Sequence, residues 1–167
     1  MSRLLVIVFI TLVFSLGWVS NSMYYAVSSP RNIQKPFIFN AQGQKIVSTP
    51  SDRITPERIH VYEDKVVIDI KNASWSTFTP THSMEPIISE KANGLEIKPS
   101  SFVDLKIGDI VSYKSEYADG LIVHRIVETG FDEKGWYAII KGDNNPQEDP
   151  GKVRFEQIHG VLIGVIY

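Results

Sequence analysis

The pattern of hydrophobic and polar positions divides the chain into an uncharged amino-terminal run and a longer region of short strands. Residues 4–30 include no charged residue, and the stretch LLVIVFITLVFSLGWV is apolar apart from one threonine, one serine and one glycine. With the residues that follow, this run approaches the roughly 20 apolar residues that a membrane helix needs. We therefore predict a transmembrane anchor over residues 1–25. A cleaved secretory signal is the alternative, because Arg3 precedes the run and small residues end it.

The next segment, residues 26–57, predicts a juxtamembrane linker. It is rich in Ser, Pro, Asn and Gln, and its prolines prevent any long helix. A short strand is expected within FIFNAQGQKIV, where Gly43 suits a tight turn.

From residue 58 onward, apolar residues alternate with polar ones at the period of a β-strand. RIHVYEDKVVIDI predicts a hairpin with its turn at Glu63 and Asp64. The stretches DIVSYK, GLIVHRIVET, WYAIIKGD and GVLIGVIY are short, β-branched or aromatic, and bounded by Gly, Asp or Pro. The last is too short to cross a bilayer, so we expect a terminal strand there. The sequence thus predicts a mainly β domain over residues 58–167.

Composition narrows the function without choosing it. A chain of 167 residues with 43% hydrophobic and 22% charged residues has enough apolar side chains for one domain with a core, and disorder is not indicated. The formal net charge of -2 gives no basic surface for nucleic acid, so no nucleic-acid partner is expected. There are no cysteines, which removes disulfides, thiolate nucleophiles and cysteine-based zinc sites.

Ser83, in the stretch TPTHSMEPII, is a candidate nucleophile. Met84 and Pro86 beside it are a plausible frame for holding a hydroxyl at the end of a strand, although a serine in a turn is more often a capping group. A hydroxyl nucleophile needs a neighbouring base, and His124 in LIVHRIVE supplies an imidazole. The alternative for His124 is a histidine satisfied within the core.

The loop KGDNNPQEDP offers Asp143 and Asp149 as carboxylates that orient the imidazole, although its composition is also that of an ordinary tight turn. A metal site built from His82, His124 and these two aspartates is a further alternative. No histidine falls in a ligand spacing such as H-E-x-x-H, so we expect neither a metal nor another cofactor.

Four stretches together resemble the ordered boxes of type I signal peptidases, in the archaeal and endoplasmic-reticulum branch. They are THSMEP (81–86), GDIVSY (108–113), IVHRIVE (122–128) and KGDNNPQED (141–149). The branch follows from His124, where bacterial relatives place a lysine base. The resemblance implies a signal-peptidase-like β domain with an N-terminal transmembrane helix, and a membrane-bound serine endopeptidase that removes signal peptides from exported preproteins.

The resemblance also assigns roles to residues. Ser83 is the expected nucleophile, His124 the general base, and Asp149, six residues beyond the aspartate of the KGD box, the acidic partner. Asp143 would support the loop or the imidazole. The Ser83 N–H and the Thr81 hydroxyl would stabilise the oxyanion. His82 occupies a position that is commonly glycine, so we expect it to crowd that geometry.

Three functional interpretations stay open at this point. The leading one is a general signal peptidase, single-pass in the membrane, with its catalytic domain on the extracytoplasmic or lumenal side. Its partners would be signal peptides and membrane lipid, with accessory subunits as an open question. The others are a specialised processing peptidase for few exported substrates, and a catalytically impaired, membrane-tethered peptide-binding domain. Asn72-Ala73-Ser74 also fits a glycosylation acceptor.

Overall fold

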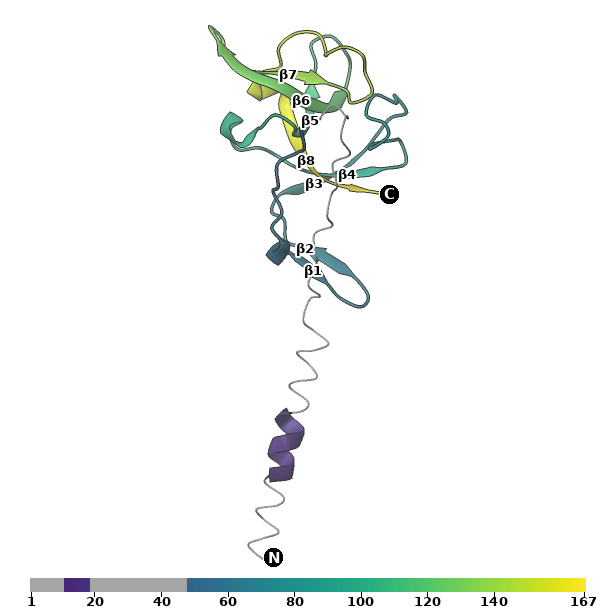
Figure 1. Ribbon diagram of the computed structural model, residues 1–167, viewed down its shortest axis with the longest axis vertical. Helices are drawn as coiled ribbons and strands as arrows, with labels where there is room; N and C mark the ends of the chain where they lie inside the picture. The colour runs from purple at the N-terminus through teal and green to yellow at the C-terminus, as the bar shows by residue number, and fades with distance from the viewer. Residues whose placement is uncertain (1–10, 19–47) are drawn as a thin grey trace, which may run out of the picture. The chain divides into compact units, whose positions relative to one another are not determined.

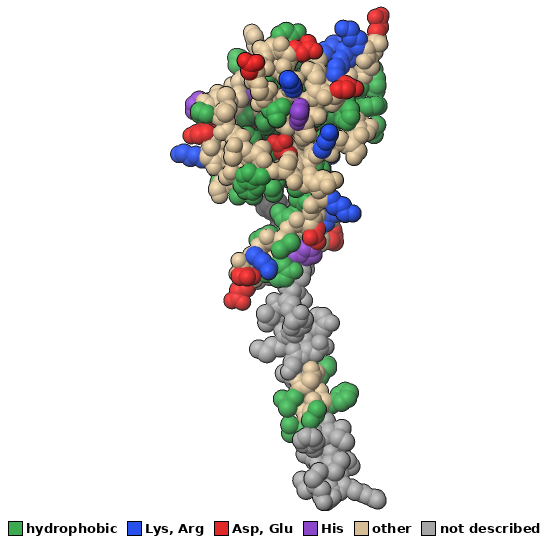
Figure 2. All heavy atoms as spheres, turned by 180° about the vertical axis from the view of Figure 1, so that it is seen from behind, with side chains coloured by type: hydrophobic (Ala, Val, Ile, Leu, Met, Phe, Trp, Pro, Cys, Tyr) green, Lys and Arg blue, Asp and Glu red, His purple; other side chains and the backbone are tan. Residues whose placement is uncertain are grey.

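The computed structural model describes residues 11–18 and 48–167 (Figure 1). Residues 11–18 form a helix, and its apolar side chains are exposed (Figure 2). Across the described ranges, no helix has both the length and the apolar character needed to cross a membrane. Most of the anchor predicted over residues 1–25, and the short strand predicted within 37–47, lie outside the described residues.

The described residues belong to two compact units. Residues 11–18 and 55–69 fall in one unit, and residues 48–54 and 70–167 fall in the other. The second unit therefore includes part of the segment that the sequence predicted as linker. Residues 48–54 belong with it because Asp109 accepts hydrogen bonds from the Ser51 N–H at 2.8 Å and from Arg53 Nη2 at 2.6 Å.

The first unit contains the hairpin predicted from RIHVYEDKVVIDI. A short 3-10 helix, η1 (Pro56–Arg58), precedes β1 (Ile59–Val61), which pairs antiparallel with β2 (Val66–Ile68). Ile59 lies opposite Ile68 and Val61 opposite Val66, so the predicted apolar positions share one face.

The second unit is one antiparallel sheet with the strand order β3-β4-β8-β5-β6-β7 (Figure 1). Its strands are β3 (Ala73–Thr77), β4 (Asn93–Ile97), β5 (Ile110–Lys114), β6 (Leu121–Asp132), β7 (Gly135–Lys141) and β8 (Ile158–Ile166). The 3-10 helices η2 (Phe102–Asp104) and η3 (Phe155–Gln157) precede β5 and β8. The predicted mainly β architecture is confirmed, and β5 to β8 correspond to the four stretches that predicted strands.

Strand β4 was not predicted, and the structure gives the reason. Its buried positions are Gly94 and Glu96, whereas its apolar residues Leu95 and Ile97 are only partly buried, so the buried face carries no hydrophobic pattern. A Cβ at Gly94 would lie 2.4 Å from Ser76 Oγ, so any other residue here would displace that side chain of β3. Glu96 is accommodated because its Oε2 accepts a hydrogen bond from Ser112 Oγ at 2.6 Å.

Two clusters of apolar side chains form the core of the sheet unit. The larger cluster gathers residues of β5, β6, β7 and β8, including Val111, Tyr113 and Ile126. The smaller cluster joins Met84 and Ile88, from the loop between β3 and β4, to Ile110 and Leu162. The loop that carries Ser83 is therefore anchored by its own buried side chains.

Candidate active site

Ser83 begins a turn in the loop between β3 and β4. Met84 and Ile88, each 4% exposed, fix this turn in the smaller core cluster, and the Ile88 N–H donates to the Met84 carbonyl at 3.0 Å. The side chain of Ser83, one residue before the buried Met84, lies at the rim of a cleft. Its Oγ lies 3.1 Å from Thr81 Oγ1 and 2.8 Å from His124 Nε2.

His124 reaches Ser83 from the first part of β6. In the register of β5 and β6 it lies opposite Val111, and it is 7% exposed. Its Nε2 faces Ser83 Oγ, and its Nδ1 lies 2.6 Å from Asp149 Oδ2. A serine hydroxyl, an imidazole and a carboxylate therefore form one continuous hydrogen-bonded chain.

Asp149 is the carboxylate that contacts the imidazole. Its backbone N–H donates to the Ile140 carbonyl of β7 at 2.8 Å, which ties the end of the 142–149 loop to the sheet. Its side chain is 10% exposed. The structure thus brings Ser83, His124 and Asp149 together, three residues that are far apart in the sequence.

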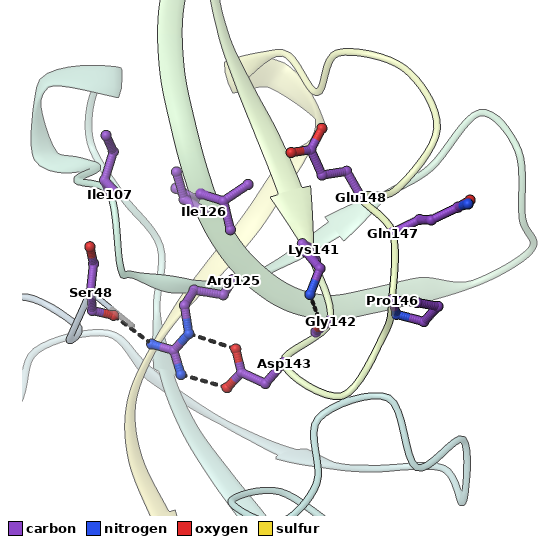
Figure 3. Close-up of a pocket in the computed structure, with 11 residues that line it drawn as sticks. Ser48, Ile107, Arg125, Ile126, Lys141, Gly142, Asp143, Pro146, Gln147 and Glu148 are labelled. Atoms are coloured by element: carbon purple, nitrogen blue, oxygen red, sulfur yellow. Dashed lines mark hydrogen bonds and ion pairs between the residues drawn. The ribbon is translucent and has the colours of Figure 1, made fainter. Parts of the chain in front are cut away.

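Asp143 occupies a different place. Its two oxygens accept hydrogen bonds from Arg125 Nε at 2.7 Å and Nη2 at 2.6 Å, as Figure 3 shows. Arg125 is 4% exposed and also donates through Nη1 to the carbonyls of Gly108 and Ser48. Of the two roles expected for Asp143, the geometry matches support of the loop, because its carboxylate pairs with Arg125 rather than with the imidazole.

Asn144 joins the loop of Asp143 to the turn of Ser83. The Asn144 N–H donates to the Ser83 carbonyl, and its Nδ2 donates to the His82 carbonyl, both at 2.9 Å. Gly142 is required beside them, since a Cβ there would lie 2.7 Å from the Ser83 carbonyl oxygen. The sequence interpretation treated Asn144 only as a turn residue, because nothing in the sequence shows which carbonyls its amide would meet.

His82 does not place its side chain on the Ser83 hydroxyl. Its backbone is in the left-handed region, with φ 59°, and its Nδ1 lies 2.7 Å from Glu85 Oε1. The hydrogen bond and the negative charge of Glu85 raise the pKa of His82 above its ordinary value. A left-handed backbone explains why glycine suits this position, and the outward imidazole lies beside Glu85.

Tyr113 is a member of the site that the sequence reasoning missed. Its hydroxyl donates to Asp149 Oδ2 at 2.8 Å, on the same oxygen that His124 Nδ1 approaches. Burial, together with the hydrogen bond and charge of Asp149, strongly raises the pKa of Tyr113. A sequence signal existed: Tyr113 is two positions after Val111, the residue opposite His124, so the side chains of Tyr113 and His124 lie on one face of the sheet.

Two groups expected at the oxyanion lie beside the Ser83 hydroxyl. Thr81 Oγ1 contacts Ser83 Oγ, and within the described ranges no acceptor bonds the Ser83 N–H. A backbone N–H that has no partner can donate to an oxygen that becomes negatively charged during a reaction.

Two clefts lie near these residues. The smaller, of about 400 Å³, is lined by Ser83 and His124 with Thr79, Asp119 and Val123 among its walls. The larger, of about 720 Å³, is lined by the Arg125–Asp143 pair, Lys141 and Glu148 (Figure 3). Neither Ser83, His124 nor Asp149 lines the larger cleft, so the smaller one is the candidate substrate site.

In the described part of the chain, no group of three or more His, Asp or Glu side chains is arranged to hold a metal ion. His82 contacts Glu85 and Asp143 contacts Arg125, so two of the four residues in the metal alternative face other partners.

Comparison with protein-family models, curated proteins and solved structures found no match for this chain. The functional conclusion therefore depends on the geometry of the site and on the resemblance of its four sequence stretches. Chemically, the arrangement can remove a proton from a serine hydroxyl, stabilise the resulting imidazolium, and donate hydrogen bonds to an oxyanion.

Proposed function

We propose that this chain is a membrane-bound serine endopeptidase of the signal-peptidase type, with Ser83 as nucleophile, His124 as general base and Asp149 as the carboxylate that orients it. The observation that carries the proposal is the chain of contacts from Ser83 Oγ to His124 Nε2, at 2.8 Å, and from His124 Nδ1 to Asp149 Oδ2, at 2.6 Å. The first distance is within the range for proton transfer to a positioned base, and the second is that of a hydrogen bond that orients the imidazole.

Acylation follows from this geometry. His124 Nε2 takes the proton from Ser83 Oγ as that oxygen attacks the carbonyl carbon of the scissile peptide bond. The negative oxygen of the tetrahedral intermediate accepts hydrogen bonds from the Ser83 N–H and the Thr81 hydroxyl. When the C–N bond breaks, His124 donates the proton that it took from Ser83 to the leaving amine, and an ester remains on Ser83.

Deacylation reverses these roles with water. His124 takes a proton from the attacking water, the second tetrahedral intermediate collapses, and the proton returns to Ser83 Oγ as the carboxylic acid leaves. Asp149 accepts the hydrogen bond from His124 Nδ1 and stabilises the imidazolium in both half-reactions.

The substrate class rests on the four resembling stretches and on the apolar amino-terminal run. A signal peptide lies in a bilayer and presents its cleavage site at the outer surface. Anchoring the peptidase to that membrane therefore raises the local concentration of substrate at the peptidase. The cleft at Ser83 is lined by residues 77–79 and by Leu121–Val123, and an extended peptide can add as a strand beside these segments. The catalytic domain would then be extracytoplasmic or lumenal.

Cleavage of a preprotein by the full chain in detergent tests the proposal. Ser83→Ala should abolish cleavage and labelling by a fluorophosphonate probe, whereas Ser89→Ala, in the same loop, should retain both. Ser89 is a matched control because, within the described residues, its hydroxyl accepts from the Lys91 N–H and contacts neither Ser83 nor His124. Cleavage that persists in Ser83→Ala would overturn the mechanism, and persistence together with sensitivity to a chelator would favour a metal enzyme.

A further inference from the structure

Tyr113 places a hydroxyl at the base of the site without taking part in the proton transfers described above. Its side chain is 1% exposed and belongs to the larger core cluster, where a phenylalanine would make the same apolar contacts. A buried hydroxyl is unfavourable unless it is hydrogen-bonded, and Tyr113 satisfies this requirement on Asp149 rather than on the backbone.

The position of that bond is specific. Tyr113 Oη and His124 Nδ1 both address Asp149 Oδ2, at 2.8 Å and 2.6 Å. Two donors on one oxygen divide the negative charge that the oxygen offers to each. The bond from Tyr113 also restrains the Asp149 carboxylate, whose backbone is held by the bond from the Asp149 N–H to the Ile140 carbonyl.

We propose that Tyr113 is a positioning residue that lowers the basicity of His124 and fixes the direction of its ring, by sharing Asp149 Oδ2 with Nδ1. The consequence for the cleavage rate rests on the proposed function, whereas the consequence for the titration of His124 does not.

The hydroxyl of Tyr113 remains a donor at any pH of interest, because burial and the negative charge of Asp149 strongly raise its pKa. When a phenylalanine replaces it, the whole charge of Oδ2 acts on the imidazolium. The charged form of His124 then becomes more favourable, and its titration midpoint moves to higher pH.

The other charged groups near His124 are the same in the wild type and in Tyr113→Phe. Arg125 and Asp143 neutralise each other through two hydrogen bonds, and His82 is paired with Glu85. Asp119 lines the cleft together with His124. Lys114 and Glu148, the neighbours of Tyr113 and Asp149 in the chain, are exposed. A difference between wild type and Tyr113→Phe therefore reports the one bond removed.

The test is an NMR titration of the histidine ring resonances in the full chain, with His124→Gln used to assign the signal of His124. Tyr113→Phe should raise the titration midpoint of His124 by about one pH unit. Tyr137→Phe is the matched control, because it removes a tyrosine hydroxyl of the same sheet, one that lies 3.5 Å from Glu128 Oε1. In this control the titration midpoint of His124 should equal that of the wild type. Equal midpoints in all three proteins would overturn the proposal, even if Tyr113→Phe unfolded at a lower temperature.

The pH dependence of kcat/KM extends the test to the reaction. In Tyr113→Phe the acid limb of the profile should shift to higher pH by about one pH unit, as in the NMR titration. The plateau value of kcat/KM should fall about tenfold, because the imidazole is less well oriented. If the wild type neither cleaves a preprotein nor labels at Ser83, the proposed function fails, and the NMR titration still decides the role of Tyr113. A lowered plateau with an unmoved acid limb would reduce Tyr113 to packing alone.

Discussion

The two aspartates of the 142–149 loop give the sharpest prediction, because Asp149 contacts His124 whereas Asp143 pairs with Arg125. Replacing Asp149 by Asn keeps the shape of the side chain and removes its charge. The imidazolium that forms on His124 would then lose the carboxylate whose Oδ2 lies 2.6 Å from Nδ1. Both side chains are about nine-tenths buried, at 8% and 10% exposed, so solvent screens this pair weakly.

The magnitude follows from Coulomb's law. Two unit charges whose centres lie about 4 Å apart interact by about 4 kcal/mol at an effective dielectric constant of about 20. Since each 1.36 kcal/mol changes a rate tenfold, Asp149→Asn should lower kcat by about 10³-fold. Its unfolding temperature should change little, because an amide can still accept a hydrogen bond from His124 or Tyr113.

Asp143→Asn is the matched comparison, with the same substitution in the same loop. It leaves the buried Arg125 guanidinium without its charged partner, which costs about 3 kcal/mol of folding free energy. For a chain of this size, that lowers the unfolding temperature by about 10 °C, and cleavage measured well below that temperature should fall less than in Asp149→Asn.

The assay is cleavage of a preprotein under single-turnover conditions, with thermal unfolding followed by circular dichroism. The reasoning is refuted if Asp149→Asn cleaves within tenfold of the wild type, or if Asp143→Asn is the more impaired catalyst while its unfolding temperature is unchanged.

Two further predictions concern stability. Because His82 has a left-handed backbone, the free energy of unfolding of His82→Gly should exceed that of His82→Ala by about 1 kcal/mol. Both variants should still be labelled at Ser83 by the fluorophosphonate probe. Equal stability of the two variants in urea denaturation would contradict the backbone argument. Burial acts to raise the pKa of Asp109, but the Ser51 and Lys106 N–H donors and Arg53 outweigh it, so this pKa lies below its usual value. A lowered pKa in the folded state means that the stabilisation is present above the unfolded pKa of about 3.9 and is lost as pH falls through the folded value. The difference in unfolding free energy between wild type and Asp109→Asn should therefore shrink as pH falls below about 4, and a difference that stays constant from pH 7 to pH 3 would show that the charge of Asp109 does not contribute.

Local pattern was sufficient for much of the fold. The hairpin of β1 and β2 and the strands β5 to β8 were predicted because their apolar residues alternate in sequence and their ends carry turn residues. Strand β4 was missed because its buried positions are Gly94, which lies against Ser76 of β3, and Glu96, which accepts a hydrogen bond from Ser112 of β5. Such partners are remote in sequence, so no local pattern reports them.

The sequence by itself determined the mainly β character of this protein, its lack of thiol chemistry, and the candidates Ser83, His124, Asp143 and Asp149. Residue type and spacing carry that information, because a hydroxyl, an imidazole and a carboxylate have the same chemistry wherever they lie. Only the tertiary structure decided which aspartate faces the imidazole, that His82 turns toward Glu85, and that Tyr113 shares the oxygen of Asp149. These choices depend on distances of a few ångströms between strands and loops that the chain brings together only when the sheet forms.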